Sequence, residues 1–132
     1  MSYEVNSDPQ RGAFSVTITG GTTTANGGLA AIPNPEGVDL VISDAALYVK
    51  SNSTGSANLT MGTANSGTVA ADSMLPTTAM EAAAGKVFGL TYHGTALATE
   101  RTKWGSAQYI NVTGSASTAG LEAILFVKYF RV

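Results

Sequence analysis

The sequence predicts an all-β fold, a single antiparallel β-sandwich of the jelly-roll kind with an extended N-terminal arm. Short runs alternate apolar and polar residues, loops rich in Gly and Thr separate these runs, and no internal repeat or long helical period is present. About seven or eight short strands with at most one short helix are typical of a sandwich. With 132 residues, the chain is long enough for one core. We therefore assign residues 1–12 to the arm and residues 13–132 to one domain.

The arm is polar, contains Pro9 and shows no hydrophobic period. This composition indicates a segment that is either disordered or laid across a neighbour. Tyr3 and Val5 are its two side chains able to seat in a neighbour's groove. Ordering the arm costs about 1–2 kcal/mol of backbone entropy per residue. We therefore expect the arm to be unnecessary for folding and to order only against a partner.

Alternation begins at residues 14–19, which predict a half-buried strand ended by two glycines. Residues 29–37 contain two prolines, which exclude a helix and predict a strand fragment followed by a tight turn. Residues 38–50 form the longest β-prone run, and its apolar phase flips near Ser43 and Asp44. The flip indicates either a β-bulge or a strand that passes from one sheet to the other.

Residues 57–63 predict a partner strand for that run. The least strand-like segment follows, over residues 64–84. Within it, Thr78 and Glu81 have the spacing of a helix capping box, and Gly85 suits the end of a helix. We therefore expect one short helix in this segment.

Three further strands are predicted before the last one. Residues 87–92 and 96–103 have modest strand character, and residues 107–113 alternate more clearly. The loop at residues 114–120 is rich in small residues. We expect it to close an antiparallel hairpin with the terminal strand.

The terminal stretch, residues 120–132, predicts the central strand of the sandwich. One side is apolar from Leu121 to Tyr129, and the other side carries Ile124, Phe126 and Phe130. A strand in a two-layer sandwich usually keeps one face in water. The second apolar face therefore indicates cover by a loop, an arm or another subunit. Burial of these side chains would contribute roughly 1.5–3 kcal/mol each, and truncation of a core-packed Phe126 to Ala would cost about 3–5 kcal/mol.

The composition limits the possible partners. Charged residues make up 12% of the chain, with a formal net charge of -2, against about 25% charged residues in ordinary domains. The sequence therefore lacks the basic patch that phosphate contacts need, which argues against nucleic acid as a partner. It also lacks the charge repulsion that keeps small domains apart, which favours self-association over a weakly charged monomer.

The same composition bears on location. The chain has no cysteine, which excludes disulfides and fits a reducing compartment. The start has neither a basic nor an apolar leader region, and no apolar run approaches the roughly 18–20 residues of a spanning helix. We therefore expect a soluble protein that does not bind membranes.

Candidate catalytic residues are few. His93 is the only histidine, so a catalytic triad or a two-histidine metal site would have to use it. The carboxylates follow no calcium-loop pattern and offer no glycosidase pair that the sequence can check. Residues 22–28 are Gly- and Thr-rich but lack the lysine and the following helix of a phosphate-binding loop. We predict no enzymatic activity, no cofactor and no metal.

Aromatic residues leave a second class of function open. Trp104, Tyr92, Tyr109 and His93 could line a sugar-binding face, because flat rings stack on pyranoses. A single tryptophan beside a glycine is more often a core or interface anchor. The interface candidates from sequence are Tyr3, Val5, Trp104, Ile124, Phe126 and Phe130.

Two stretches carry a resemblance to a known family. They are Gly28-Leu-Ala-Ala-Ile-Pro-Asn-Pro-Glu-Gly-Val-Asp-Leu-Val-Ile42 and Trp104-Gly-Ser-Ala-Gln-Tyr-Ile-Asn-Val-Thr113, followed by a glycine-bounded loop and a strand that ends the sequence. With them the chain resembles small virion proteins of tailed bacteriophages, and within that group capsid decoration, or cement, proteins. The similarity covers most of the chain beyond the arm and transfers no catalytic residue. Decoration proteins use several unrelated folds, so the jelly roll rests on the strand pattern and not on the family.

The resemblance implies an oligomer, commonly a trimer, that sits on the outside of an assembled shell and braces neighbouring capsomers. Its partners would be further copies of itself and the major capsid protein, and its location the capsid surface of the virion after synthesis in the host bacterial cytoplasm. We then expect the arm to be needed for attachment to the shell. The alternative from another class is a glycan- or receptor-binding module of a phage tail or fibre.

Overall fold

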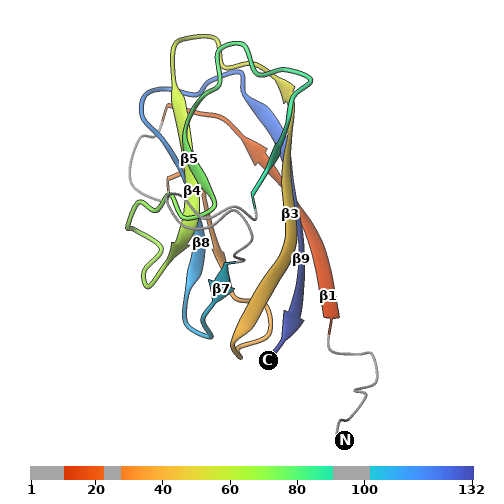
Figure 1. The fold of residues 1–132 in the computed structure, drawn as a ribbon. Helices are drawn as coiled ribbons and strands as arrows, with labels where there is room; N and C mark the ends of the chain where they lie inside the picture. Colours follow the sequence, from red (N-terminus) through yellow and green to blue (C-terminus); the bar gives the residue numbers. More distant parts are fainter. Residues whose placement is uncertain (1–10, 23–27, 91–101) are drawn as a thin grey trace, which may run out of the picture.

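Two antiparallel sheets pack face to face in this computed structural model, which describes residues 11–22, 28–90 and 102–132 (Figure 1). Sheet A has five strands, in the order β1-β9-β3-β6 with β7 pairing β3 beside that path, and sheet B has four, in the order β2-β8-β4-β5. The strands are β1 (Arg11–Thr19), β2 (Ala30–Pro33), β3 (Leu40–Ser51), β4 (Asn58–Ala64), β5 (Leu75–Ala79), β6 (Val87–Gly89), β7 (Lys103–Trp104), β8 (Tyr109–Gly114) and β9 (Glu122–Arg131).

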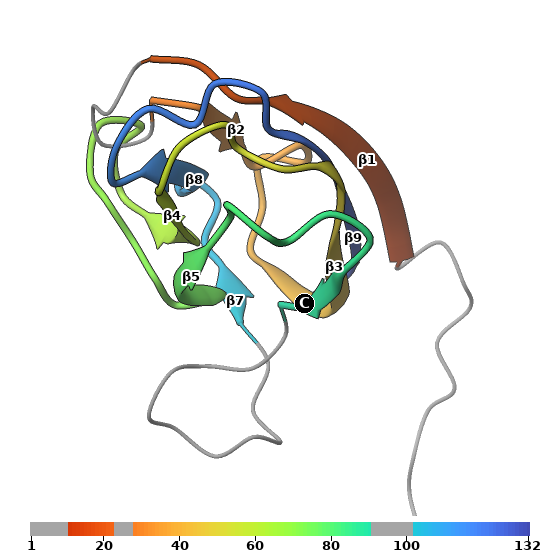
Figure 2. The same cartoon turned by 90° about the horizontal axis from the view of Figure 1, so that it is seen from above.

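The strand order is that of a jelly roll. With the short β7 set aside, the remaining strands pair first with last, second with seventh, third with sixth and fourth with fifth. Figure 2 shows the two layers from above, with β1, β9 and β3 on one side and β2, β8, β4 and β5 on the other. The predicted all-β jelly-roll sandwich is confirmed. None of the described residues belongs to a helix, so they include none long and apolar enough to cross a membrane.

Strand β9 lies between β1 and β3 and is the central strand of sheet A, as predicted. Its inward residues Ala123, Leu125 and Val127 are buried. They pack in one cluster with apolar residues of both sheets. The largest fully buried side chains from the other strands are Ile18, Leu40, Ile42, Leu47, Leu59, Met61, Trp104 and Ile110.

A β-bulge in β3 explains the phase flip near Ser43. The register between β3 and β9 shifts between Ile42 and Asp44, which leaves Ser43 as the extra residue. Ile42 and Ala45 are therefore both buried, although three positions separate them. The strand stays in sheet A on both sides of this point. The bulge is thus the correct alternative, and a passage between sheets is not.

The short helix predicted from Thr78 and Glu81 is wrong. Strand β5 covers part of this segment and pairs with β4. Met80 continues the pairing, since its N–H donates to the carbonyl of the residue before β4 at 2.9 Å. Burial of Met80 in the core outweighs the local helix signal. Gly85, with a φ of 84°, ends a turn and not a helix.

The hairpin predicted between residues 107–113 and the terminal strand is also wrong. Strand β8 lies in sheet B and β9 in sheet A, so the loop between them crosses the end of the sandwich (Figure 1). Thr118 anchors this loop, because its N–H donates to the Gly21 carbonyl at 2.9 Å and its hydroxyl accepts from the Gly21 N–H at 3.2 Å. A Cβ at Gly20 would clash with the Thr118 carbonyl, so the crossing needs glycine there.

Other strand boundaries differ from expectation. Strand β1 begins at Arg11, so Arg11 and Gly12, placed in the arm from sequence, pair with β9. Strand β6 is shorter than expected and ends at Gly89. The strand expected over residues 96–103 lies mostly outside the described residues, of which only Lys103 belongs to a strand, β7.

We predict that Leu125→Ala and Phe126→Ala differ sharply in their effect on folding. Leu125 is fully buried, so its truncation should lower the free energy of unfolding by about 2–5 kcal/mol. Phe126 is 48% exposed on the other side of β9, which corrects the expectation of a core-packed ring, so its truncation should cost less than about 1 kcal/mol. Chemical denaturation at low protein concentration measures both losses. Equal losses would contradict the assignment of the two faces.

Candidate functional site

The outer face of sheet A carries apolar side chains that the sandwich does not cover. Successive side chains of a strand point to opposite faces, and in β9 the inward row is buried against sheet B. The outward row contains Ile124, Phe126 and Phe130. These are the residues for which the sequence predicted an additional cover.

Neighbouring strands extend this row into one group. Directly opposed side chains of antiparallel strands lie about 4.5–5.5 Å apart at Cβ. The register opposes Ile124 to Tyr48, Phe126 to Ala46, Phe130 to Val41, and Tyr48 in turn to Val87. We call Val41, Tyr48, Val87, Ile124, Phe126 and Phe130 the outer apolar cluster.

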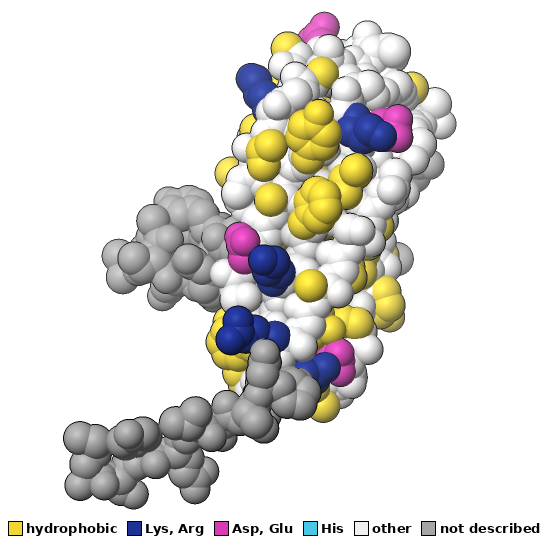
Figure 3. Space-filling model, turned by 90° about the vertical axis from the view of Figure 1, so that its right-hand side faces the viewer, with side chains coloured by type: hydrophobic (Ala, Val, Ile, Leu, Met, Phe, Trp, Pro, Cys, Tyr) yellow, Lys and Arg dark blue, Asp and Glu magenta, His cyan; other side chains and the backbone are white. Residues whose placement is uncertain are grey.

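Four of the six residues of the outer apolar cluster are exposed in the single chain, and Val41 and Ile124 are half-buried. The exposed fractions are 64% for Val87, 48% for Phe126, 38% for Tyr48 and 37% for Phe130. Figure 3 looks onto this side of the molecule and shows hydrophobic side chains along its middle, with Lys or Arg and Asp or Glu side chains beside and between them. Burial of each ring would contribute about 1.5–3 kcal/mol. Lys128 and Asp44 separate Phe130 and Val41 from the other four residues, and exposed apolar groups of this kind are typical of an interaction surface.

Charges of opposite sign face each other at two places on the same face. Lys50 Nζ lies 3.4 Å from Glu122 Oε1, and Lys128 stands opposite Asp44 in the register. Exposed pairs of this kind contribute little to folding. Each pair is neutral in sum, so these charges would not repel a second copy of the face.

The structure brings three of the six interface candidates together. Ile124, Phe126 and Phe130 belong to the outer apolar cluster. Trp104 does not: its side chain is buried, and its Nε1 donates to the Gln108 carbonyl at 3.0 Å, so it anchors the core. The other two candidates, Tyr3 and Val5, lie outside the described residues.

Sequence reasoning missed Val41, Tyr48 and Val87. On both sides of the bulge in β3, Val41 and Tyr48 fall on the phase opposite to the main apolar run of the strand. Their position beside Phe130 and Ile124 follows only from the pairing of β3 with β9. Only the register between paired strands places these residues in the cluster, and the sequence does not fix the register of distant strands.

A hydrogen-bond network closes the end of the sandwich where β2 turns into β3. Asn34 Oδ1 accepts from the N–H groups of Glu36 and Gly37 at 2.9 and 3.0 Å, which holds the turn. Asn34 Nδ2 donates to the carbonyls of Trp104 and Gly105 at 3.2 and 3.1 Å. One side chain therefore joins the β2–β3 turn to the chain that follows β7.

Glu36 ties the same turn to the end of β9. Its carboxylate accepts from the Tyr129 hydroxyl at 2.7 Å and from Arg131 at 2.8 Å for Nη2 and 3.2 Å for Nε. The hydrogen bond from Arg131, and after it that from Tyr129, lowers the pKa of Glu36. Burial, and then the bond to Glu36, raises the pKa of Tyr129.

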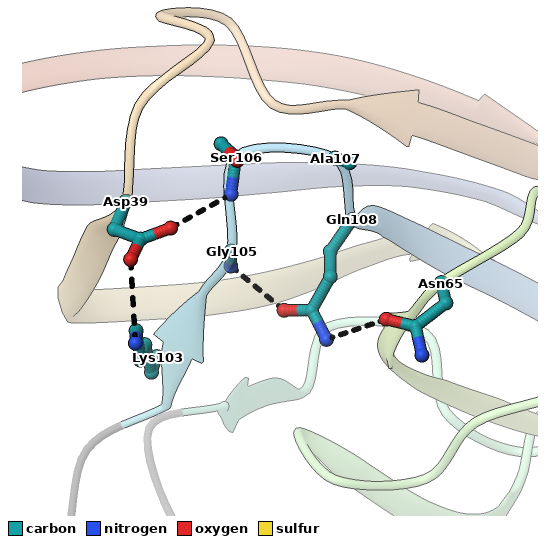
Figure 4. A pocket seen from close by; sticks show the side chains of 7 residues that line it. All are labelled: Asp39, Asn65, Lys103, Gly105, Ser106, Ala107 and Gln108. Carbon is teal, nitrogen blue, oxygen red and sulfur yellow. Dashed lines mark hydrogen bonds and ion pairs between the residues drawn. The ribbon is translucent and has the colours of Figure 1, made fainter.

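A hollow of about 410 Å³ lies beside this network (Figure 4). On one side, Asp39 accepts from the Ser106 N–H at 3.0 Å and pairs with Lys103 Nζ at 3.3 Å. The backbone bond from Ser106, and then the bond from Lys103, lowers the pKa of Asp39. On the other side, Gln108 Oε1 accepts from the Gly105 N–H at 2.7 Å. These wall groups bond to one another, which makes them ties between loops.

Other kinds of site find little support among the described residues. They contain no group of three or more His, Cys, Asp or Glu side chains that could hold a metal. Of the rings considered for a sugar-binding face, Trp104 is buried and cannot stack on a ligand, and Tyr109 is half-buried at the start of β8. Tyr92 and His93 lie outside the described part of the chain. The outer apolar cluster is therefore the candidate functional site.

Comparisons with known proteins add one likeness. No family model matches the chain, and no curated protein matches it in sequence. Among solved structures, it is similar to a chain of the structure titled "Capsid of Ralstonia phage GP4", with a TM-score of 0.54 and 16% sequence identity. The match covers 100% of this chain and 91% of that chain. At this identity, the likeness shows a shared fold.

We predict an acid-sensitive contribution of Glu36 to stability. Its pKa in the folded state lies below the ordinary value of 4.5, so the contribution is fully present above that value and is lost as the pH falls through the folded pKa. Thermal unfolding at pH 7 and pH 3 should show a smaller acid-induced drop for Glu36→Gln than for the unaltered protein. The control is Glu81→Gln, near the opposite end of β3, where the side chain accepts from Ser56. An unchanged drop in Glu36→Gln would contradict the prediction.

Proposed function

We propose that this protein is a structural, non-enzymatic component of a bacteriophage virion, which decorates and stabilises the outside of the capsid as a homo-oligomer. Its proposed partners are further copies of itself, in a trimer, and the major capsid protein. The observation that carries the proposal is the outer apolar cluster, an exposed group on the central strand of an otherwise well-packed sandwich.

The structural likeness supports the placement in a capsid. It spans the whole chain, and the other structure is titled as a phage capsid. Fold alone does not fix function. The likeness gains weight here because the described residues offer an apolar face and no metal cluster, which suits a protein that works through surface contacts.

The outer apolar cluster supports self-association. Its rings would gain roughly 1.5–3 kcal/mol each on burial, and its charges already stand opposite partners of opposite sign. A contact surface with buried aromatic anchors and little net charge is typical of stable interfaces. Cyclic symmetry is the usual arrangement for such assemblies.

Oligomerisation would also explain strong attachment through weak contacts. A trimer that contacts several capsid subunits gains avidity, because later contacts form at a high effective concentration. Each copy then needs only a modest surface for the shell. A protein bound in this way would link neighbouring capsomers and resist their separation.

We predict that Phe126→Asp breaks both the oligomer and the attachment. A buried charge at the centre of the contact should weaken self-association at least about 30-fold, the scale of a hot-spot loss. Sedimentation equilibrium should then report the 13.4 kDa monomer, whereas the unaltered protein gives a multiple of it. Binding to capsids purified without this protein should fall in parallel. Thr77→Asp, an exposed change in β5 of sheet B, is the matched control and should alter neither.

Two outcomes would contradict the proposal. One is an unaltered protein that stays monomeric at micromolar concentration and does not bind capsids. The other is a virion that carries the protein only at the tail, together with glycan binding by the isolated protein. The second result would favour the glycan- or receptor-binding alternative.

A further inference from the structure

Strand β1 is a long, unguarded edge of sheet A. It has 9 residues and pairs with β9 on one side, and no strand of the described chain pairs with its other side. Natural edge strands are usually short, or carry Lys, Pro or a bulge that prevents pairing with another chain. The β1 sequence Arg-Gly-Ala-Phe-Ser-Val-Thr-Ile-Thr has no Lys or Pro, and its register with β9 has no shift.

The free backbone groups of this edge can be assigned. Gly20 N–H donates to the Leu121 carbonyl at 2.8 Å, and the backbone groups of an antiparallel strand alternate between its two sides. Every second residue before Gly20 therefore directs its N–H and C=O groups toward β9. The N–H and C=O groups that point away from β9 are therefore those of Ala13, Ser15, Thr17 and Thr19.

The side chains at this edge favour one kind of partner. Phe14 and Val16 pack against the core but stay half-buried, because no strand of the sheet continues beyond β1. On the opposite face, Ala13, Ser15 and Thr17 are small and exposed. The edge therefore fits an extended peptide whose apolar residues are two positions apart, so that both cover the Phe14 and Val16 pair.

We propose that the N-terminal arm of a second copy adds to β1 as a further strand. Tyr3 and Val5 are two positions apart, so in an extended arm they fall on one face. That face would cover Phe14 and Val16. The inference rests on the self-association part of the proposed function and adds a second contact between copies, beside that of the outer apolar cluster.

Pro9 disfavours a tight return of the arm onto its own β1. Two-residue hairpin turns take a positive φ at their first position, whereas proline fixes φ near −65°, and Pro9 and Gln10 immediately precede β1. A fully extended arm of ten residues reaches about 33 Å. Five residues paired along an edge occupy about 17 Å. The other residues of the arm can then span the distance between two copies.

This contact joins two different surfaces, the arm of one copy and the β1 edge of the next. Such a contact can form reciprocally in a two-fold dimer, or head to tail around a ring such as a trimer. The arm would then support attachment to the shell indirectly, because it builds the assembly that presents several copies at once.

Cysteine cross-linking tests the contact in the full-length protein, because the chain has no cysteine of its own. Glu4→Cys is mixed in turn with Ala13→Cys, Ser15→Cys and Thr17→Cys, which cover successive registers on the outer face. A disulfide needs Cα atoms within about 7 Å of each other. We expect a linked pair of chains for at least one combination. Its yield should exceed that with Thr77→Cys, an exposed threonine on the edge strand β5, by at least about ten-fold, since paired strands hold the sulfurs at high effective concentration.

The remaining outcomes overturn the inference. The inference is wrong if the disulfide yield with Ala13→Cys, Ser15→Cys and Thr17→Cys never exceeds that with the Thr77→Cys control. A chain carrying both Glu4→Cys and a β1 cysteine that closes only on itself assigns the arm to its own β1. A photo-reactive group on Glu4→Cys that couples on virions to the capsid protein, and never to β1, assigns the arm to the shell.

The same experiment separates this inference from the proposed function. Linked chains that do not bind capsids would contradict the capsid role and leave the arm contact intact. Capsid binding without linked chains would contradict the arm contact alone.

Discussion

The pairing of β9 with both β1 and β3 is the constraint on which the rest of sheet A depends. The inward row around Leu125 fills the core, and a slip of one residue would replace it with the row that holds Phe126 and Lys128. The core therefore fixes the register, and the register fixes where the outer row lies. Phe126 and Phe130 face outward because of the packing of their neighbours, and no contact of their own has to hold them there. An interaction face placed in this way is preformed, so little ordering cost opposes its use.

Residues 28–42 and 104–113, the two stretches singled out from the sequence, meet at one end of the sandwich. Asn34 of the first stretch donates to Trp104 and Gly105 of the second, and Glu36 of the first binds Tyr129 and Arg131 of the terminal strand. Their side chains therefore close turns and join loops that are distant in sequence. The sequence pattern in these stretches is explained by the architecture of the fold, and the candidate interaction face lies on different residues.

The fold could be predicted further than the site, for a physical reason. Alternation along β9 is a local signal and led to the correct central strand. The flip near Ser43 is also local and left two alternatives, of which the bulge is correct. The helix expected near Thr78 failed because pairing with β4 and burial of Met80 outweigh a local capping pattern. The final hairpin failed because a loop does not reveal whether it stays in one sheet or crosses to the other. Tyr48 joins the outer apolar cluster only through pairing between distant strands, which no local pattern encodes.

Folding and assembly depend on different residues, but strand β1 takes part in both. Phe14 lies on the inner side of this edge strand, with its ring centre 6.0 Å from that of Trp104 and 6.3 Å from that of Tyr129. Such aromatic contacts contribute about 0.5–1.5 kcal/mol beyond the area they bury, and here the outermost ring is only half-buried. A strand added beside β1 would shield this ring, and with it one side of the aromatic core. Since a partner that binds only the folded state stabilises it, assembly through this edge would strengthen the same core that positions the outer face.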